Sequence, residues 1–197
     1  MFSFRCSGCG QMVRKACEQC ASKIALCPTP HCSDALVALS YVGLVRDLML
    51  AFKYRNHRAL AQLFADRLVA TLRTSVEIDS IDVVTWVPTT RERRTARGHD
   101  QAETLARILG RSLGLPVRKL LVRETAGHQT GQNRENRLIG VSLRARSMNT
   151  PITVLVVDDV VTTGATMRFA QHVLYGAGAT RVICAAVAST PAPAWRR

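Results

Sequence analysis

VLVVDDVVTTGATM, residues 154–167, combines in order an apolar strand, two acids, a turn and the start of a helix. The continuous apolar residues before Asp158 are typical of a strand that is covered on both faces. The Thr-Thr-Gly turn ends this segment, and apolar residues recur at helical spacing from Ala165 onward. A buried strand that passes through a tight turn into a helix favours a parallel sheet.

Strand-like and helix-like patterns alternate on both sides of this run. Strands are predicted at residues 35–41, 81–87, 117–122, 152–157 and 182–187. Helices are predicted at residues 45–52, 60–72, 101–113 and 165–174. An Arg-rich loop is expected after Pro88, where the second strand ends. The alternation predicts an α/β fold, a mostly parallel doubly wound sheet with helices on both faces, whose ligands bind beyond the carboxyl ends of the strands.

The turn between strand and helix has the features of a phosphate-binding cup. The first backbone N–H groups of a helix lack partners and point outward, and the helix dipole favours an anion beside them. Gly164 allows the backbone to approach such a ligand closely. The cup would consist of five residues, three of which carry hydroxyl donors: Thr162, Thr163, Gly164, Ala165 and Thr166.

The acid pair that precedes the cup is suited to bind a sugar. Asp158 and Asp159 carry acceptor oxygens and have no basic neighbour in the sequence, so they can bind the 2′- and 3′-hydroxyls of a ribose whose phosphate lies in the cup. An ordinary polar turn with a helix cap would use the same residue types. We favour a ribose 5-phosphate site because strand, acids, turn and helix occur in the order that such a site requires.

This segment resembles the phosphoribosyl-diphosphate-binding motif of type I phosphoribosyltransferases. Three further stretches resemble the ComF branch of that superfamily: LMLAFKYRNHRALAQLFADRL at 48–68, VPTTRERRTARGHDQAETLAR at 87–107 and HQTGQNRENRLIG at 128–140. The resemblance covers nearly the whole chain and implies the type I phosphoribosyltransferase fold. It also implies phosphoribosyl diphosphate as the ligand, bound together with Mg²⁺.

Site roles follow from the resemblance residue by residue. Asp158 and Asp159 would hold the ribose and serve as the catalytic acids, while the cup would hold the 5′-phosphate. The loop that receives the diphosphate would consist of Pro88, Thr89 and Arg91. In a transfer reaction, arginine and magnesium would neutralise the leaving diphosphate.

A second motif of the branch lies between residues 97 and 101. Arg97, Gly98 and Gln101 match its RG-x-x-Q signature, whereas His99 and Asp100 stand where an aromatic residue and Asn are more usual. This departure leaves the ligand specificity open. No stretch of the sequence identifies the acceptor of the phosphoribosyl group.

A long polar segment, residues 123–137, is predicted to be a mobile loop. Its overlap with the stretch 128–140 implies a lid over the site, which would exclude water during the reaction. In the resemblance, the lid residues are Gln129, Arg134 and Arg137, and the two arginines could reach the diphosphate. A solvated loop would explain the same polar residues equally well.

The start of the chain is rich in cysteine, with six of the seven cysteines before residue 33. Four of them form two C-x-x-C pairs with the spacing of a closed, structural Zn²⁺ site: Cys6, Cys9, Cys17 and Cys20. Redox or disulfide roles are the alternatives. Cys27, His31 and Cys32 could complete a second site or replace a ligand, but we favour a single zinc ion because no fourth partner lies nearby.

The end of the Cys-rich segment marks a domain boundary near residue 34. We predict a zinc-ribbon-like unit at residues 1–34 and a phosphoribosyltransferase-like domain at 35–197. A unit of this size needs a staple such as a metal to fold. Proteins of the ComF branch carry a similar N-terminal zinc-ribbon segment, which supports the division.

The formal net charge of +13 suggests anionic partners, either phosphate-rich small molecules or nucleic acid. Codon bias is an alternative explanation, because 23 of the 27 basic residues are scattered arginines. No apolar run approaches the roughly 20 residues of a membrane helix. The first residues lack a secretory pattern. We therefore expect a cytoplasmic protein without membrane insertion.

Two functions of different classes follow. The chain could be an enzyme that transfers the phosphoribosyl group to an acceptor that the sequence does not identify. It could instead be a non-catalytic accessory of DNA uptake and natural transformation, the role that the ComF resemblance implies, which binds partner proteins or single-stranded DNA and uses the site to sense a ligand. The small share of aromatic residues, 5%, argues against an extensive base-stacking surface.

Overall fold

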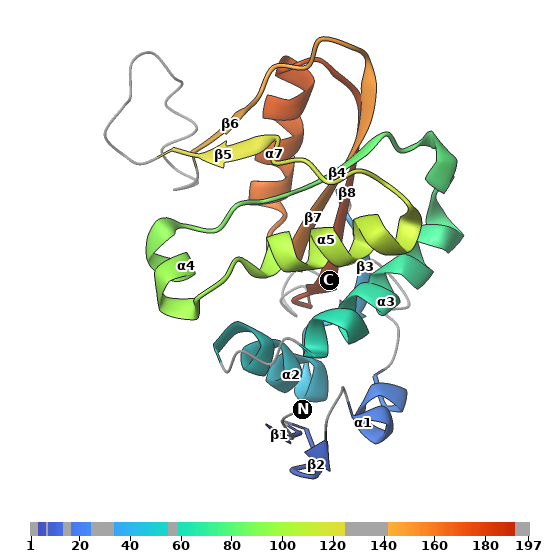
Figure 1. Ribbon diagram of the computed structural model, residues 1–197, viewed down its shortest axis with the longest axis vertical. Coiled ribbons are helices and arrows are strands. Elements are labelled where there is room, and N and C mark those ends of the chain that lie inside the picture. The colour runs from blue at the N-terminus through green and yellow to red at the C-terminus, as the bar shows by residue number, and fades with distance from the viewer. Residues whose placement is uncertain are drawn as a thin grey trace.

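A computed structural model describes residues 4–6, 8–13, 17–24, 34–54, 59–124 and 142–191 (Figure 1). Its centre is a four-stranded sheet in which every neighbouring pair is parallel. In spatial order the strands are β3 (Leu36–Ser40), β8 (Ala179–Ser189), β7 (Ile152–Val161) and β4 (Val83–Trp86). The predicted α/β fold class is therefore confirmed.

The apolar run of β7 explains why this strand lies inside the sheet. Val154, Leu155, Val156 and Val157 are fully buried and pair with both β4 and β8. Alternate side chains point to opposite faces, so the run needs cover on both sides. Burying each such side chain stabilises the fold by about 1.5–3 kcal/mol.

Helices provide that cover on both faces. On one face, Leu155 of β7 belongs to a core formed with α2 (Gly43–Tyr54), α3 (Ala59–Ser75) and α5 (Gln101–Leu113). On the other face, Val156 packs with α7 (Ala165–Gly176) and with a small antiparallel pair, β5 (Leu121–Arg123) and β6 (Leu143–Ala145). Figure 1 shows α5 and α7 on different sides of the sheet. None of the helices in the described part of the chain is long and apolar enough to cross a membrane.

Two sequence predictions about local structure were wrong. The Arg-rich loop after Pro88 contains a helix, α4 (Arg91–Arg97), whose start is capped by Thr90 Oγ1 accepting a hydrogen bond from the Arg93 N–H over 3.2 Å. Its sequence has no apolar period, but its cap and arginines suit a helix. Residues 117–122 do not form one strand, because Val117 makes an isolated bridge to Val84 and only the end of the stretch enters β5.

The N-terminal residues form a small unit that packs against α2 and α3 (Figure 1). It comprises β1 (Phe4–Arg5), β2 (Met12–Val13) and α1 (Glu18–Ser22). Leu44, near the start of α2, packs against three of its buried cysteines. Arg67 of α3 donates a hydrogen bond to the Ala21 carbonyl over 3.0 Å. The domain boundary at residue 34 stays a prediction.

Candidate functional site

An open hollow lies at the carboxyl end of β7, where the strand turns into α7. The empty space among its lining residues is about 240 Å³, which includes open solvent. Its lining comprises Asp158, Val160, Val161, Thr162, Thr163, Gly164, Ala165, Thr166 and Met167. The sequence-predicted cup and one of the two predicted acids therefore line the same hollow, at the edge of the sheet where parallel α/β proteins bind ligands.

The backbone of the cup has the conformation that the sequence suggested. Gly164 caps α7 with a φ of 75°, in the left-handed region that favours glycine. Thr163 Oγ1 accepts a hydrogen bond from the Ala165 N–H over 3.4 Å. Thr162 and Thr163 are exposed, so their hydroxyls are accessible from the hollow. The start of a twelve-residue helix and accessible hydroxyls together form an environment for an anion.

The two acids occupy different environments. Asp158 lines the hollow, and its Oδ1 accepts a hydrogen bond from the backbone N–H of Asp159 over 2.8 Å. Burial, followed by the neighbouring charge of Asp159, raises the pKa of Asp158 well above its ordinary value. Asp159 turns instead towards α2, where its Oδ2 lies 3.0 Å from the Nζ of Lys53.

Lys53 was missed by sequence reasoning, which found no basic partner for the acids. The residue lies 106 positions before Asp159, so no local spacing connects the two. One signal was present, because Lys53 is one of four lysines in a chain whose other 23 basic residues are arginine. It also lies inside the first of the ComF-like stretches, 48–68.

The predicted diphosphate loop follows β4. At its start Pro88 is buried and Thr89 is partly buried, whereas Arg91 is exposed at the first position of α4. The backbone N–H of Thr89 donates to Asp100 Oδ2 over 3.0 Å. Asp100 is buried, and this burial raises its pKa. The loop is therefore held by the first turn of α5.

A second cation that the sequence did not single out lies beside this loop. Arg123 of β5 is half-buried and donates from Nε to the Pro88 carbonyl over 3.1 Å. Burial and the charge of Arg93 lower the pKa of Arg123, and the charges of Asp158 and Asp100 oppose this shift. A guanidinium stays charged under ordinary conditions, so Arg123 brings a positive charge between the loop and the hollow.

The signature residues gather at the end of α2 rather than in the hollow. Arg97 stacks on the ring of Tyr54, with its Cζ 4.9 Å from the ring centre. Gly98 ends α4 with a φ of 73°. Gln101 is buried at the first position of α5, next to Arg97 and the end of α2. The predicted lid residues Gln129, Arg134 and Arg137 lie outside the described residues.

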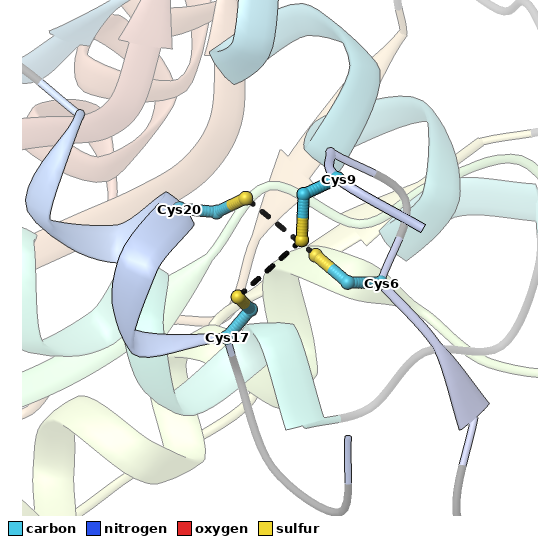
Figure 2. Close-up of side chains that lie close together, drawn as sticks. All are labelled: Cys6, Cys9, Cys17 and Cys20. Atoms are coloured by element: carbon cyan, nitrogen blue, oxygen red, sulfur yellow. Dashed lines mark hydrogen bonds between the residues drawn. The ribbon is translucent and has the colours of Figure 1, made fainter. Parts of the chain in front are cut away.

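The four cysteines of the C-x-x-C pairs converge in the N-terminal unit, with their sulfurs pointing toward one another (Figure 2). The Cys6 and Cys20 sulfurs are 3.7 Å apart, and those of Cys9 and Cys17 are 3.6 Å apart. Sulfurs at the corners of a tetrahedron with zinc–sulfur bonds of about 2.3 Å lie roughly 3.8 Å apart. The geometry therefore fits a zinc ion. Cys27, His31 and Cys32 lie outside the described residues.

The ionisation of these thiols also favours a cation between them. Burial raises the pKa of Cys6, but hydrogen bonds from the backbone of Cys9 and Gly8 outweigh it and lower that pKa to about 7. Burial and the neighbouring Cys6 thiol raise the pKa of Cys20 to about 12. Four sulfurs this close cannot all carry charge without a compensating cation.

Comparison with protein families connects this site to known proteins. The family described as Phosphoribosyl transferase domain matches residues 99–196. That range contains the acids, the cup and the two inner strands of the sheet, β7 and β8, and it begins two residues before α5.

Two characterised relatives extend the likeness. Competence protein ComFC of Bacillus subtilis is 27% identical over 141 residues, which cover 71% of this chain and 57% of the relative. Competence protein F of Haemophilus influenzae is 24% identical over 199 residues and covers 90% of this chain and 86% of the relative. The chain thus spans little more than half the length of the Bacillus protein.

Among solved structures, the glutamine phosphoribosylpyrophosphate amidotransferase from B. subtilis complexed with ADP and GMP is 25% identical, with a TM-score of 0.46. The match covers 64% of this chain and 26% of that protein. Because the TM-score is low, the fold assignment rests on the sheet order and the acid-turn-helix segment. Together with the family match and the two competence proteins, these features assign the chain to the ComF family within the type I phosphoribosyltransferase superfamily.

Proposed function

We propose that this protein binds phosphoribosyl diphosphate with Mg²⁺ and transfers its phosphoribosyl group to an acceptor. The observation that carries the proposal is the hollow at the end of β7, which combines the Asp158 carboxylate with the turn and first residues of α7. The 5′-phosphate would lie in the cup formed by Thr162 to Thr166. Asp158 and Asp159 would accept hydrogen bonds from the ribose hydroxyls.

The residues present suit magnesium as a partner of the substrate. Mg²⁺ prefers oxygen ligands, keeps several waters and binds substrate phosphates through one or two carboxylates. The Asp158 carboxylate in the hollow is a ligand of this kind. When bound, the ion would neutralise charge on the diphosphate.

In the proposed reaction, the bond from ribose C1 to the diphosphate oxygen breaks and C1 forms a bond to the acceptor atom. Diphosphate leaves with the bonding electrons, and the acceptor releases its proton to solvent. Arg123, beside Pro88, would stabilise the leaving group, because preorganised positive charge lowers the energy of such a transition state. Arg91, at the start of α4, would reach the same group from the exposed side.

The N-terminal unit would hold a structural zinc ion. Four thiols support this proposal, because three of them are buried and all four sulfurs lie within 4.8 Å of one another. A site closed by four thiolates has no position for a substrate, so its role would be to fold the unit and its contacts with α2 and α3. Metal analysis of the purified full-length protein tests this assignment.

Calorimetric titration with phosphoribosyl diphosphate and Mg²⁺ tests the proposed ligand. We expect wild-type protein to bind and the Asp158→Asn plus Asp159→Asn variant to lose at least about tenfold in affinity, since the ribose would lose its charged acceptors. A matched control is Glu77→Gln plus Asp79→Asn, which removes two exposed charges before β4. Equal affinity in all three proteins would exclude the acid pair as the ribose site.

A second measurement separates catalysis from binding. Incubation of the protein with phosphoribosyl diphosphate, Mg²⁺ and a candidate acceptor should release diphosphate in an amount that matches the acceptor consumed. Binding without release for any acceptor would favour a ligand-sensing role instead.

A second candidate function is an accessory role in DNA uptake. Two observations favour it: the matched relatives are named competence proteins, and α4 exposes a row of arginines, Arg91, Arg93 and Arg94. The test is single-stranded DNA binding that weakens steeply with salt and survives loss of the two acids. Replacement of the three arginines by Gln should weaken such binding. If binding instead depends on Asp158 and Asp159, the DNA would be acting at the sugar-phosphate site.

A further inference from the structure

A mostly buried ion pair lies beside the candidate ribose site. The Nζ of Lys53 and the Oδ2 of Asp159 are 3.0 Å apart, and their side chains are only 16% and 13% exposed. Lys53 comes from the end of α2, whereas Asp159 comes from β7 on the central sheet. The pair therefore connects a helix to the strand that carries both acids.

The end of α2 is in turn held by the signature segment. The side-chain amide of Gln101 donates from Nε2 to the Lys53 carbonyl over 3.3 Å. Its Oε1 accepts from Arg97 Nη1 over 3.2 Å. Arg97 also donates from Nη2 to the Tyr54 hydroxyl over 3.1 Å. Two consecutive residues of α2 are thus contacted by one side chain from the end of α4 and one from the start of α5.

A third contact completes this arrangement. The ring of His99 lies 5.9 Å from the ring of Phe52, which immediately precedes Lys53. One ring nitrogen of His99 is 3.0 Å from the Arg97 carbonyl. The segment from Arg97 to Gln101 therefore contacts three consecutive residues at the end of α2, including the lysine that reaches Asp159.

We propose that Lys53 is the positioning residue for the ribose end of the site, and that the Arg97–Gln101 segment acts as a clamp that keeps Lys53 in place. The inference deepens the proposed function and rests on it. Lys53 acts through Asp159, because its ammonium holds one carboxylate oxygen of Asp159 and leaves the rest of that group for the sugar. The Arg97–Gln101 segment thus acts on the ligand indirectly, through Lys53 and Asp159.

The physical need for such a residue follows from the acids themselves. Asp158 and Asp159 are adjacent and poorly solvated, so their charges repel each other. A cation beside Asp159 offsets this repulsion and restrains a side chain that would otherwise have to be ordered when the sugar binds. Groups fixed before binding give higher affinity, because less conformational freedom is lost on association. Arg123 donates to the Pro88 carbonyl of the diphosphate loop rather than to Asp159.

The closing experiment compares Lys53→Met, Lys53→Arg and the matched control Arg46→Met. Arg46 lies on the same helix and is exposed, so its loss removes an equal charge away from the site. With Mg²⁺ present, we expect Lys53→Met to weaken binding of phosphoribosyl diphosphate and ribose 5-phosphate at least about tenfold. Lys53→Arg should recover most of that loss, and Arg46→Met should bind like the wild type.

Binding of inorganic phosphate distinguishes a positioning role of Lys53 from a merely structural one. Lys53 contacts Asp159 and is not one of the residues that line the hollow with the cup, so Lys53→Met should retain phosphate affinity within about twofold of the wild type. An equal loss for phosphate and for the sugar phosphates would overturn the positioning role, because the ammonium would then act on the anion or on the fold. Unchanged sugar-phosphate binding in Lys53→Met would also overturn it, while leaving the proposed function intact.

Gln101→Leu tests the same proposal if Lys53→Met does not fold. This variant keeps the lysine but removes the amide that holds its carbonyl. We expect a loss in the same direction, of about threefold, restricted to the sugar-containing ligands. Wild-type binding by a folded Gln101→Leu protein would contradict the clamp. If the wild-type protein itself binds no sugar phosphate, the proposed function fails and the positioning role falls with it.

Discussion

The buried carboxylate of Asp100 accepts a hydrogen bond from the backbone N–H of Thr89 over 3.0 Å, which ties the start of α5 to the loop after β4. The other oxygen of the same carboxylate accepts from the Glu103 N–H over 3.2 Å and caps the helix. One acid thus joins two elements that the sequence separates by eleven residues.

Asp100→Ala should remove both hydrogen bonds. We expect it to lower the free energy of unfolding by about 1–3 kcal/mol, because it deletes a helix cap and leaves the partly buried Thr89 N–H without its acceptor. Chemical denaturation measures this change. Asp66→Ala, which alters an exposed acid on α3, is the control and should stay within about 0.5 kcal/mol of the wild type. Equal losses in the two variants would contradict the role of Asp100.

Asp158→Asn should stabilise the ligand-free protein while it weakens sugar binding. Burial raises the pKa of Asp158, so the folded protein retains a proton that the unfolded chain releases. Stability from this group is therefore lost as pH rises through the folded-state pKa. We expect the variant to have the higher Tm at neutral and alkaline pH, with the difference shrinking toward about pH 4. A lower Tm for Asp158→Asn at pH 8 would show that the buried charge of Asp158 does not destabilise the folded protein.

Gly110→Ala should destabilise the packing of α5 on the sheet. An added Cβ would lie 2.2 Å from Val117 Cγ2 and 2.9 Å from the Leu115 carbonyl oxygen. Overpacking of this kind typically costs about 1–3 kcal/mol. Gly176→Ala, at the end of α7, meets nothing within 4 Å and should be neutral or slightly stabilising. Thermal unfolding of the two variants side by side checks the difference.

Cys20→Ser should abolish zinc binding and lower the Tm of the protein. Cys20 is buried against Leu44 of α2, so loss of the metal should be felt beyond the N-terminal unit. Cys27→Ser plus Cys32→Ser is the control and should retain a single zinc ion. Metal content and thermal unfolding provide the two measurements. Retention of zinc by Cys20→Ser would point to a different set of ligands.

Arg123→Met should weaken phosphoribosyl diphosphate more than ribose 5-phosphate, because the guanidinium lies beside Pro88 and the diphosphate loop. We expect a difference of about tenfold between the two ligands. Arg118→Met, which changes another cation of the same connecting segment, should affect both ligands little. Parallel losses for the two ligands would place the Arg123 charge at the 5′-phosphate instead.

Much of the fold could be predicted because its decisive signals are local. The apolar run before Asp158 predicted the central strand, and helix α5 spans the residues at which a helix was predicted, 101–113. The ComF assignment, made from motifs, is confirmed by the family match and the competence proteins. Helix α4 escaped prediction because it lies on the surface and has no apolar period.

The parts of the site that escaped prediction are contacts between distant segments. Lys53 meets Asp159, and Arg123 meets Pro88, only because the sheet and its helices bring these positions together. No spacing along the chain reports such a contact. The roles assigned to the cup, the diphosphate loop and the lid stay predictions, since they concern bound ligands.

Strand β7 continues past its neighbour β4, whose last paired residue, Trp86, lies opposite Val157. Strand β8 stays paired to the end of β7, so beyond Val157 one side of β7 has no adjoining strand among the residues that the structure describes. Just beyond the end of β4, the Asp159 N–H donates to Asp158 Oδ1 instead of to a carbonyl of a neighbouring strand. The carboxylate thus provides an acceptor for a backbone N–H at a strand edge to which another chain could add. Asp158→Ala, unlike Asp158→Asn, should therefore make the protein prone to aggregation.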